Sequence, residues 1–213
     1  MIRYRNILVA LCSLSLLSTG LSKEYDNQGS LAISVNQDLP KGFDIDFLHE
    51  LRSKENNTTL KKSFSELGLR YKISDYLSTG IAYRYSIYPD KYSERLSLSS
   101  VAKIKTGGFS HRYDLKYQKD MDSDDLPEHL IRHSYGVRHK LKWGLTPYID
   151  HEIFTQTEKD KWEIVKHRTN IGFNKKLNST TALKIYYRIQ DEVNVKKPDS
   201  VRMIGLKFDI ELK

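Results

Sequence analysis

The chain has 213 residues, of which 38% are hydrophobic and 29% charged, with a formal net charge of +8 and a mean hydropathy of −0.58. This length allows one ordinary domain or one barrel. Beyond about the first twenty residues, no apolar run is long enough for a transmembrane helix. A membrane β-barrel is still compatible with this composition, because only alternate residues of such a barrel face lipid. The 14 tyrosines favour a barrel, since tyrosine suits strands and membrane–water interfaces.

Residues 1–22 are predicted to be a signal peptide that is cleaved after Ser22. Arg3 and Arg5 form its basic end, and Ile7 to Leu17 is an apolar run of about the length of a secretory core. A retained anchoring helix is the alternative, but this run is too short to span a bilayer. The only cysteine of the chain lies within this segment. The remaining basic residues are spread out, and no block of like charges predicts a nucleic-acid-binding arm.

Residues 23–30 are expected to be a short polar leader, and residues 31–213 a single β-barrel domain. The first strand is predicted at residues 31–38, where every second side chain is apolar. A period of two is the strand period, because successive side chains point to opposite faces. After a tight turn at residues 39–42, a second alternating run covers residues 43–52.

The clearest hairpin covers residues 67–88, with a turn at Ser74, Asp75 and Tyr76. One of its faces is apolar and aromatic, and the other is small, polar or basic. No helical periodicity and no linker interrupts the remaining chain, so the strands are expected to form one continuous meander. Its further alternating runs lie at residues 96–104, 109–118, 131–143, 148–153, 165–174, 183–189 and 204–212.

About eleven strands result, and the connections between them alternate in length. Short turns are expected near Pro40, Asp75, Gly107, Gly144 and Asn178, with longer and more polar loops between them. This alternation and the strand lengths are typical of an outer-membrane barrel. We therefore predict an all-β fold: an antiparallel up-and-down meander closed into a transmembrane β-barrel of 10–12 strands. An even number is expected for bacterial barrels, so the leader could supply a further strand, or the first strand could lie outside the wall.

The polar face of the predicted strands is densely charged and would line the lumen. A barrel of this size encloses a narrow lumen, in which mixed charges would pair and fill the space. The functional alternative to such a structural network is a small pore or an anion-binding cavity. The residues predicted to form the lumen network are Arg70, Lys72, Arg84, Arg112, Lys116, Arg138, Lys140, Arg168, Arg188, Asp114, Asp150 and Glu152.

Four of the seven histidines fall on the apolar face of four consecutive predicted strands: His111, His139, His151 and His167. The predicted turns place them opposite one another in that order. Cross-strand neighbours have Cβ atoms about 5 Å apart, so the imidazoles would form one row. Two or three of them would then bind a transition metal such as zinc. The alternative is that they mark the membrane interface near Trp143.

The chain resembles the domain-of-unknown-function family 2490, whose members are outer-membrane β-barrel proteins without an established activity. The resemblance covers nearly all of the chain after the signal peptide and implies a fold and a location, but no catalytic residues. An early tryptophan expected near Leu31 is missing. The pieces that carry the resemblance are Leu67-Gly68-Leu69-Arg70-Tyr71, Gly80-Ile81-Ala82-Tyr83-Arg84-Tyr85, Thr146-Pro147-Tyr148-Ile149, Ile185-Tyr186-Tyr187-Arg188 and Ile204-Gly205-Leu206-Lys207-Phe208.

The predicted function is that of a non-enzymatic outer-membrane barrel, either structural or a narrow channel or binding barrel with a charged lumen. The expected partners are outer-membrane lipids, periplasmic chaperones and the barrel assembly machinery; no nucleic acid or cofactor is expected, and the protein is expected to be a monomer. One alternative is a soluble periplasmic β-sandwich or lipocalin-like binding protein. A second is a lipid-acting barrel enzyme, for which His133 and Ser134 are the nearest base and nucleophile. Neighbours in a strand point to opposite faces, which argues against that dyad.

Overall fold

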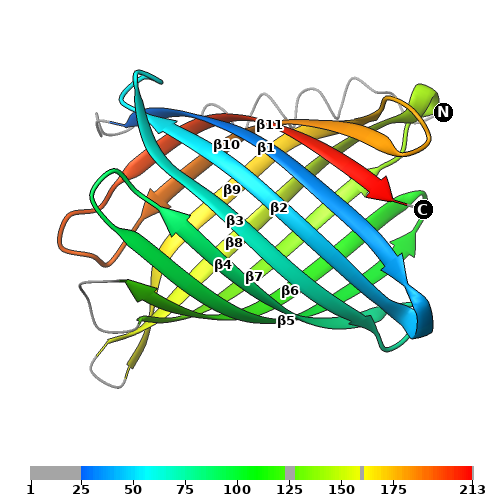
Figure 1. The fold of residues 1–213 in the computed structure, drawn as a ribbon, viewed down its shortest axis with the longest axis horizontal. Coiled ribbons are helices and arrows are strands. Elements are labelled where there is room, and N and C mark those ends of the chain that lie inside the picture. Colours follow the sequence, from blue (N-terminus) through cyan, green and yellow to red (C-terminus); the bar gives the residue numbers. More distant parts are fainter. Residues whose placement is uncertain (1–24, 123–127, 159–160, 213) are drawn as a thin grey trace.

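The computed structural model describes residues 25–122, 128–158 and 161–212, which form one closed β-barrel (Figure 1). The predicted signal peptide lies outside the described residues. Among the described residues, no helix is long and apolar enough to cross a membrane. The eleven strands are β1 (Asp26–Leu39), β2 (Phe43–Lys54), β3 (Thr59–Lys72), β4 (Leu77–Ile87), β5 (Tyr92–Thr106), β6 (Phe109–Asp122), β7 (Glu128–His139), β8 (Leu145–Glu158), β9 (Lys161–Lys176), β10 (Thr181–Glu192) and β11 (Ser200–Leu212).

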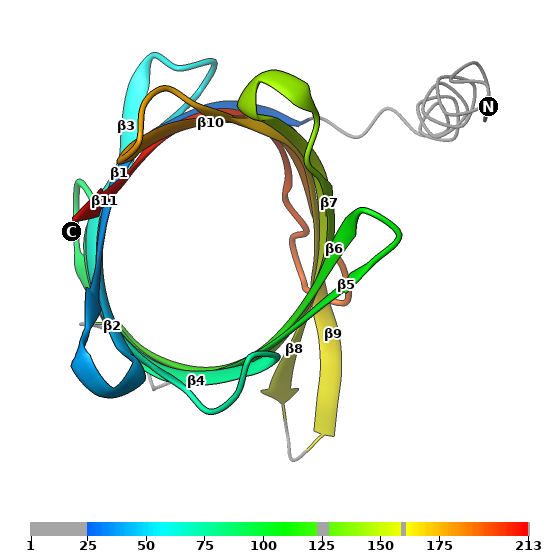
Figure 2. The ribbon, with the colours of Figure 1, turned by 90° about the vertical axis from the view of Figure 1, so that its right-hand side faces the viewer.

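Each strand pairs with its neighbours in the chain, and β1 closes the ring against β11 (Figure 2). All sequential pairs are antiparallel, but the closing pair is parallel, with Asp26 opposite Val201 and Gln37 opposite Leu212. The strand number lies within the predicted range, and the predicted antiparallel meander is confirmed from β1 to β11; only the closing pair is parallel. With an odd number of alternating strands, the first and last run in the same direction, so the seam has to be parallel.

The first strand starts earlier than the sequence predicts. Strand β1 begins at Asp26, and Ser30 pairs with both Arg52 of β2 and Gly205 of β11. Residues 26–30 therefore belong to the barrel wall, and the prediction that residues 23–30 are only a polar leader is wrong for that part. The first strand is not left outside the wall either.

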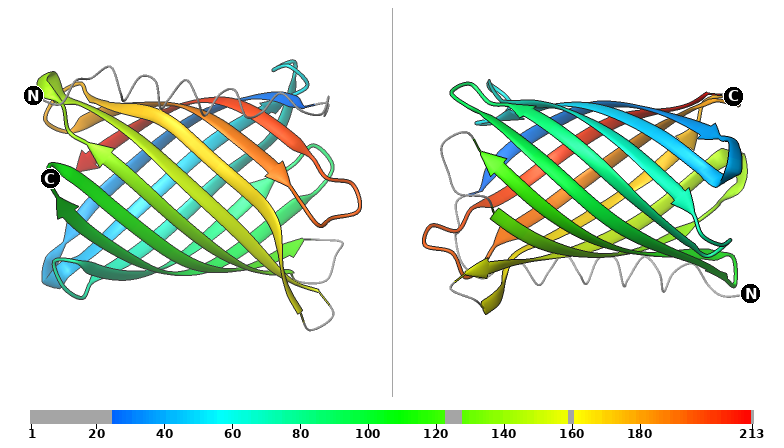
Figure 3. Two further views of the ribbon diagram at one scale, coloured as in Figure 1. Left: turned by 180° about the vertical axis from the view of Figure 1, so that it is seen from behind. Right: turned by 60° about the horizontal axis from the view of Figure 1, so that its bottom comes forward.

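Two of the tight turns are built alike. Pro40–Gly42 and Lys142–Gly144 are short 3-10 turns, and in each the last two residues have positive φ: 63° and 80° for Lys41 and Gly42, and 60° and 70° for Trp143 and Gly144. Glycine enters this region without steric cost, so it suits the final position of both turns. We call the end of the barrel that carries these turns the turn end. The opposite end, with the β10–β11 connection at residues 193–199, is the loop end (Figure 3).

The outer wall is apolar and the inner wall is polar. Leu67, Ile81 and Tyr83 are between 43% and 53% exposed although they are large hydrophobic residues, while Glu50 and Glu66 inside the ring are no more than 9% exposed. A soluble barrel or sandwich would turn its apolar side inward, away from water. This inverted arrangement contradicts the soluble β-sandwich and the lipocalin-like alternatives. The fold is a transmembrane β-barrel of the outer-membrane type.

Candidate functional site: the charged lumen

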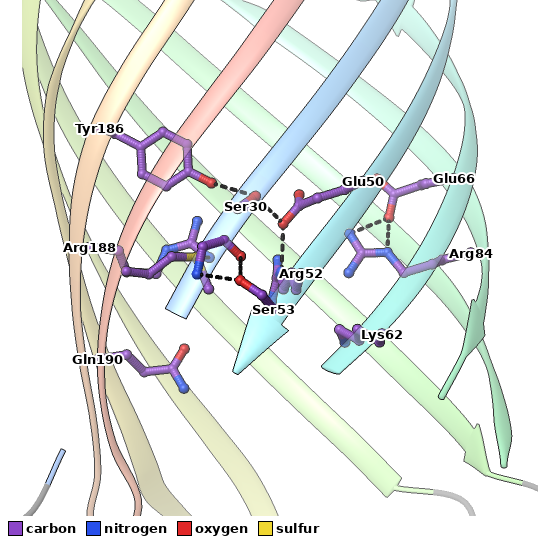
Figure 4. Close-up of polar contacts among 12 residues, drawn as sticks. Ser30, Glu50, Arg52, Ser53, Lys62, Glu66, Arg84, Tyr186, Arg188 and Gln190 are labelled. Atoms are coloured by element: carbon purple, nitrogen blue, oxygen red, sulfur yellow. Dashed lines mark hydrogen bonds and ion pairs between the residues drawn. The ribbon is translucent and has the colours of Figure 1, made fainter. Parts of the chain in front are cut away.

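The β1–β4 side of the lumen is held by two arginine–glutamate pairs. Arg52 Nε donates to Glu50 Oε1 at 2.5 Å, and Ser30 Oγ donates to the same oxygen at 2.9 Å (Figure 4). Arg84 reaches Glu66 with two nitrogens, at 2.6 and 2.7 Å. The period of two places every one of these side chains on the inner face of its strand.

The facing side, formed by β8–β10, repeats this chemistry. Arg168 donates to Glu152 Oε2 at 2.9 Å and to Gln190 Oε1 at 2.9 and 3.1 Å. Arg188 Nε donates to Asn170 Oδ1 at 2.8 Å. Glu152 lies in the positive field of three arginines, which are Arg168, Arg132 and Arg188. Positive charge is therefore concentrated around a small number of carboxylates.

Aromatic rings inside the lumen are covered by cations. Phe64 is 2% exposed, and the guanidinium carbon of Arg84 lies 4.1 Å from its ring centre. Arg168 stands 4.7 Å over Phe154, and Lys184 stands 4.3 Å over Tyr148. A cation over a ring face is attracted by the ring quadrupole, so these rings hold the basic side chains in the lumen without neutralising them.

One glycine makes room for a lumen side chain. The ring of Tyr186 lies across the strand from Gly205, where an added Cβ would come within 2.1 Å of the ring. The Tyr186 hydroxyl donates across the barrel seam to Ser30 Oγ at 3.3 Å. Any larger residue at position 205 would displace this ring, so the glycine fixes the packing beside the parallel seam.

The lumen contains a cavity toward each end. The loop-end cavity has a volume of about 520 Å³ and is lined by nine basic and six acidic residues. The turn-end cavity has a volume of about 470 Å³ and is lined by five basic and two acidic residues, with Arg138, Lys140 and Lys184 among them. Both of these cavities carry an excess of positive charge. A further turn-end cavity of about 530 Å³ differs from them, because four acidic residues and one basic residue line it.

A packed waist lies between these cavities. Glu66, Asp114, Tyr186 and Met203 line neither cavity and are between 2% and 9% exposed. Arg112 donates to Asp114 at 3.0 Å, and Lys116 lies in the field of Glu66, Asp114 and two arginines. The waist is thus a densely packed layer of charged and aromatic side chains.

Two arginines retain unused hydrogen-bonding capacity. Within the part of the chain that the structure describes, the buried Nε atoms of Arg132 and Arg138 have no hydrogen-bond partner. Arg132 lines the loop-end cavity and Arg138 the turn-end cavity. An arginine carries five donors and no acceptor, so each of these side chains places a donor-rich group beside its cavity.

The predicted lumen residues fall into three groups by position. The first group lies around the waist and the loop-end cavity and consists of Arg84, Arg112, Arg168, Arg188, Glu152, Lys116 and Asp114. Arg138, Lys140 and Asp150 lie toward the turn end, where Arg138 stands 5.8 Å over Tyr148 and Asp150 lies in the field of Lys184. Arg70 bridges Asp46 at 3.2 Å, and Lys72 sits at the rim with Asp75 at 2.7 Å.

Several lumen residues were not singled out by sequence reasoning. Arg52, Lys62, Arg95 and Arg132 all line the loop-end cavity, and Arg95 pairs with Asp120. Lys62 lies in the part of β3 that precedes the clear hairpin, and Arg95 lies in the weakest alternating run. These residues could have been found by continuing the two-residue alternation along each strand and across to its paired neighbours. That alternation places all four side chains on the inner face.

The predicted row of histidines does not form. His111 lies opposite Val137, His139 opposite Phe109, and His151 opposite Tyr135, so each predicted partner is displaced by two or four residues. His167 lies opposite Ile153. Only His151 and His167 approach each other, with ring centres 5.8 Å apart, and the described residues contain no cluster of three metal-binding side chains. The predicted row of four is therefore wrong, and a zinc site at these histidines stays a prediction that loses the register on which it was based.

His133 and Ser134 do not form a catalytic pair. The His133 imidazole points outward to the Tyr113 hydroxyl at 2.7 Å, while Ser134 faces Asp114 and Glu152 on the inner wall. The two side chains are on opposite sides of the sheet, as the strand period requires.

The structure was compared with solved structures. The KdgM porin aligns with a TM-score of 0.48 at 12% identity, covering 78% of this chain and 89% of that one. Its complex with disordered oligogalacturonate gives a TM-score of 0.48 at 12% identity, with 79% and 91% covered. The anion-selective porin from Comamonas acidovorans gives 0.43 at 12% identity, with 78% and 53% covered. None of these likenesses is close enough to transfer a function.

Sequence comparison gives a clearer assignment. No curated protein matches the chain. A family model described as a protein of unknown function, DUF2490, matches residues 28–201, which run from β1 to the start of β11. The family predicted from the sequence is thereby confirmed. This chain, a transmembrane β-barrel of the outer-membrane type, belongs to the DUF2490 family.

Proposed function

We propose that this protein is a narrow outer-membrane channel that favours small anions. The observation that supports the proposal best is the excess of positive charge in the loop-end cavity and in the turn-end cavity beside Arg138, each of which is lined by more basic than acidic residues. Rings of charged side chains select the ions that enter a pore, and a low-dielectric wall strengthens their field. Arg132 lines the loop-end cavity and Arg138 the turn-end cavity, so an anion would meet an arginine on either side of the waist.

The test is the reversal potential of the purified protein in a planar lipid bilayer under a KCl gradient. We expect a small conductance with chloride more permeant than potassium. Arg132→Gln should reduce this preference. Lys119→Gln is the matched control, because it removes the same charge from the outer face of β6, where Lys119 lies opposite Leu96. A cation preference in the unaltered protein would contradict the proposal.

The packed waist supports a second candidate, a structural barrel that does not conduct. Glu66, Asp114 and Met203 leave little free space at that level. Correctly folded protein that inserts into the bilayer but shows no channel openings would favour this candidate.

Export is also part of the proposal. We propose that residues 1–22 direct the chain to the periplasm, where chaperones and the barrel assembly machinery insert it into the outer membrane. Recovery of most of the protein from a salt-washed soluble periplasmic extract would contradict this route.

A further inference from the structure

The outer wall of the barrel contains a sector that is chemically unlike the rest. All seven histidines face outward, and six of them lie on four consecutive strands, β6–β9: His111, His129, His133, His139, His151 and His167. We call these residues, with the tyrosines that bond them, the histidine sector. The lumen chemistry makes no use of it.

Diagonal tyrosine–histidine pairs run along the β6–β7 hairpin. The Tyr135 hydroxyl lies 2.8 Å from Nδ1 of His111, and the Tyr113 hydroxyl lies 2.7 Å from Nδ1 of His133. The Tyr117 hydroxyl lies 2.5 Å from Nδ1 of His129. A neutral imidazole that accepts a hydrogen bond from a phenol at Nδ1 carries its own proton on Nε2. Each pair therefore leaves an imidazole N–H donor and a phenol oxygen with spare acceptor capacity.

The sector continues across the next two strands. Tyr135 lies directly opposite both Tyr113 on β6 and His151 on β8. His151 Nδ1 contacts the Thr169 hydroxyl at 3.0 Å, and its ring stacks on His167. Tyr135 is thus at the centre of the sector, and its side chain is 50% exposed.

This polar surface reaches the middle of the membrane. His133 is near the midpoint of the 12-residue strand β7, opposite Leu115 at the midpoint of the 14-residue strand β6. The hydrocarbon core supplies neither water nor headgroups at that depth, and an unsatisfied polar group there costs several kcal/mol. Lipid phosphates could serve the histidines at the two ends of the sector, but not His133.

The opposite wall of the barrel shows what a lipid-facing surface of this protein looks like. On β3 and β4 the outward residues at the same depth include Leu67, Leu69, Ile81 and Tyr83, which are between 42% and 53% exposed. No histidine is present there. The two walls belong to the same barrel and span the same bilayer, so the polarity of the histidine sector calls for a different neighbour.

We propose that the histidine sector is the surface through which two copies of this chain associate in the membrane. The sector consists of imidazole and phenol rings without lysine, arginine, aspartate or glutamate, and it offers both donors and acceptors, so it complements a second copy of itself. Around a two-fold axis the Nε2–H groups of His111, His129 and His133 in one copy can donate to phenol oxygens of the other. A partner recognised through charge would need charged groups along the sector, whereas its central residues Tyr113, His133 and Tyr135 have none. This proposal differs from the monomer expected from the sequence.

The first test is disulfide cross-linking in native outer membranes. The only cysteine of the chain is Cys12, in the predicted signal peptide. After cleavage, an introduced cysteine would therefore be the only one able to form a disulfide between two copies. Tyr135→Cys should give a covalent dimer on mild oxidation. Tyr83→Cys, a tyrosine of similar exposure on the opposite wall, is the matched control and should not. Equal cross-linking of the two variants would overturn the proposal.

The second test does not depend on cysteine geometry. Light scattering in mild detergent should give the mass of two chains for the unaltered protein and of one chain for the variant His111→Leu with His133→Leu. If the sector faced lipid instead, these leucines would only make the wall more apolar, leaving the mass unchanged and the barrel more stable. A single-chain mass for the unaltered protein in both detergent and lipid nanodiscs would overturn the proposal. A dimer that persists in the double leucine variant would also overturn the proposal. The proposal would likewise fail if the unaltered protein carried a bound lipid or a different protein that the double leucine variant loses.

Discussion

Removal of the Glu66 carboxylate should destabilise the barrel by leaving Arg84 without its partner. Arg84 holds Glu66 with nitrogen–oxygen distances of 2.6 and 2.7 Å, and the two side chains are only 16% and 11% exposed. Breaking a buried ion pair by removing one partner costs about 3–5 kcal/mol, because the remaining charge is uncompensated. Phe64 below the guanidinium offsets a small part of this, about 0.5–1 kcal/mol. We therefore expect Glu66→Gln to lower the free energy of unfolding by about 3 kcal/mol.

The measurement is urea unfolding of the barrel in lipid vesicles, followed by the fluorescence of Trp143 and Trp162. Glu66→Gln combined with Arg84→Gln should recover most of the loss, since two neutral amides leave no unpaired charge. Asp75→Asn is the control, because its ion pair with Lys72 is at the exposed rim and should not change stability measurably. A double variant that is no more stable than Glu66→Gln alone would refute the reasoning.

Three further predictions follow from the walls and the packing. Tyr83→Arg should reduce assembly into the outer membrane, because arginine on a lipid-facing wall costs about 2–4 kcal/mol near the midplane. Heat-modifiable migration on gels measures the yield of folded barrel. A yield equal to that of the unaltered protein would show that the two faces are reversed. Gly205→Val should destabilise the barrel by about 1–3 kcal/mol through overlap with the Tyr186 ring. Adding Tyr186→Ala should relieve that overlap and restore part of the free energy of unfolding measured in urea. A double variant no more stable than Gly205→Val alone would contradict the packing of Tyr186 against Gly205. His139→Ala with His151→Ala should leave zinc uptake by equilibrium dialysis unchanged, and a clear loss would restore the metal site.

The predicted faces depended on the sequence alone. Leu67, Ile81 and Tyr83 alternate with Gly68, Ala82 and Arg84, and this period of two assigns each side chain to a wall without reference to any other strand. The turns at Lys41-Gly42 and Gly107-Gly108 could be placed for a similar reason, since positive φ favours glycine locally. A barrel with an apolar outside and a charged inside follows from such local rules.

Tertiary structure decided the register and everything that depends on it. His111 faces Val137 because the β6–β7 connection is centred one residue earlier than the sequence suggests, and a shift of one residue at the centre moves every partner by two. The parallel β1–β11 seam follows from closing an odd number of strands, a property of the whole ring. The pairing of Arg84 with Glu66 is likewise fixed by the β3–β4 register, because the sequence offered several carboxylates on the same face. Alternation is a property of one strand, whereas contacts between side chains require the relative positions of two.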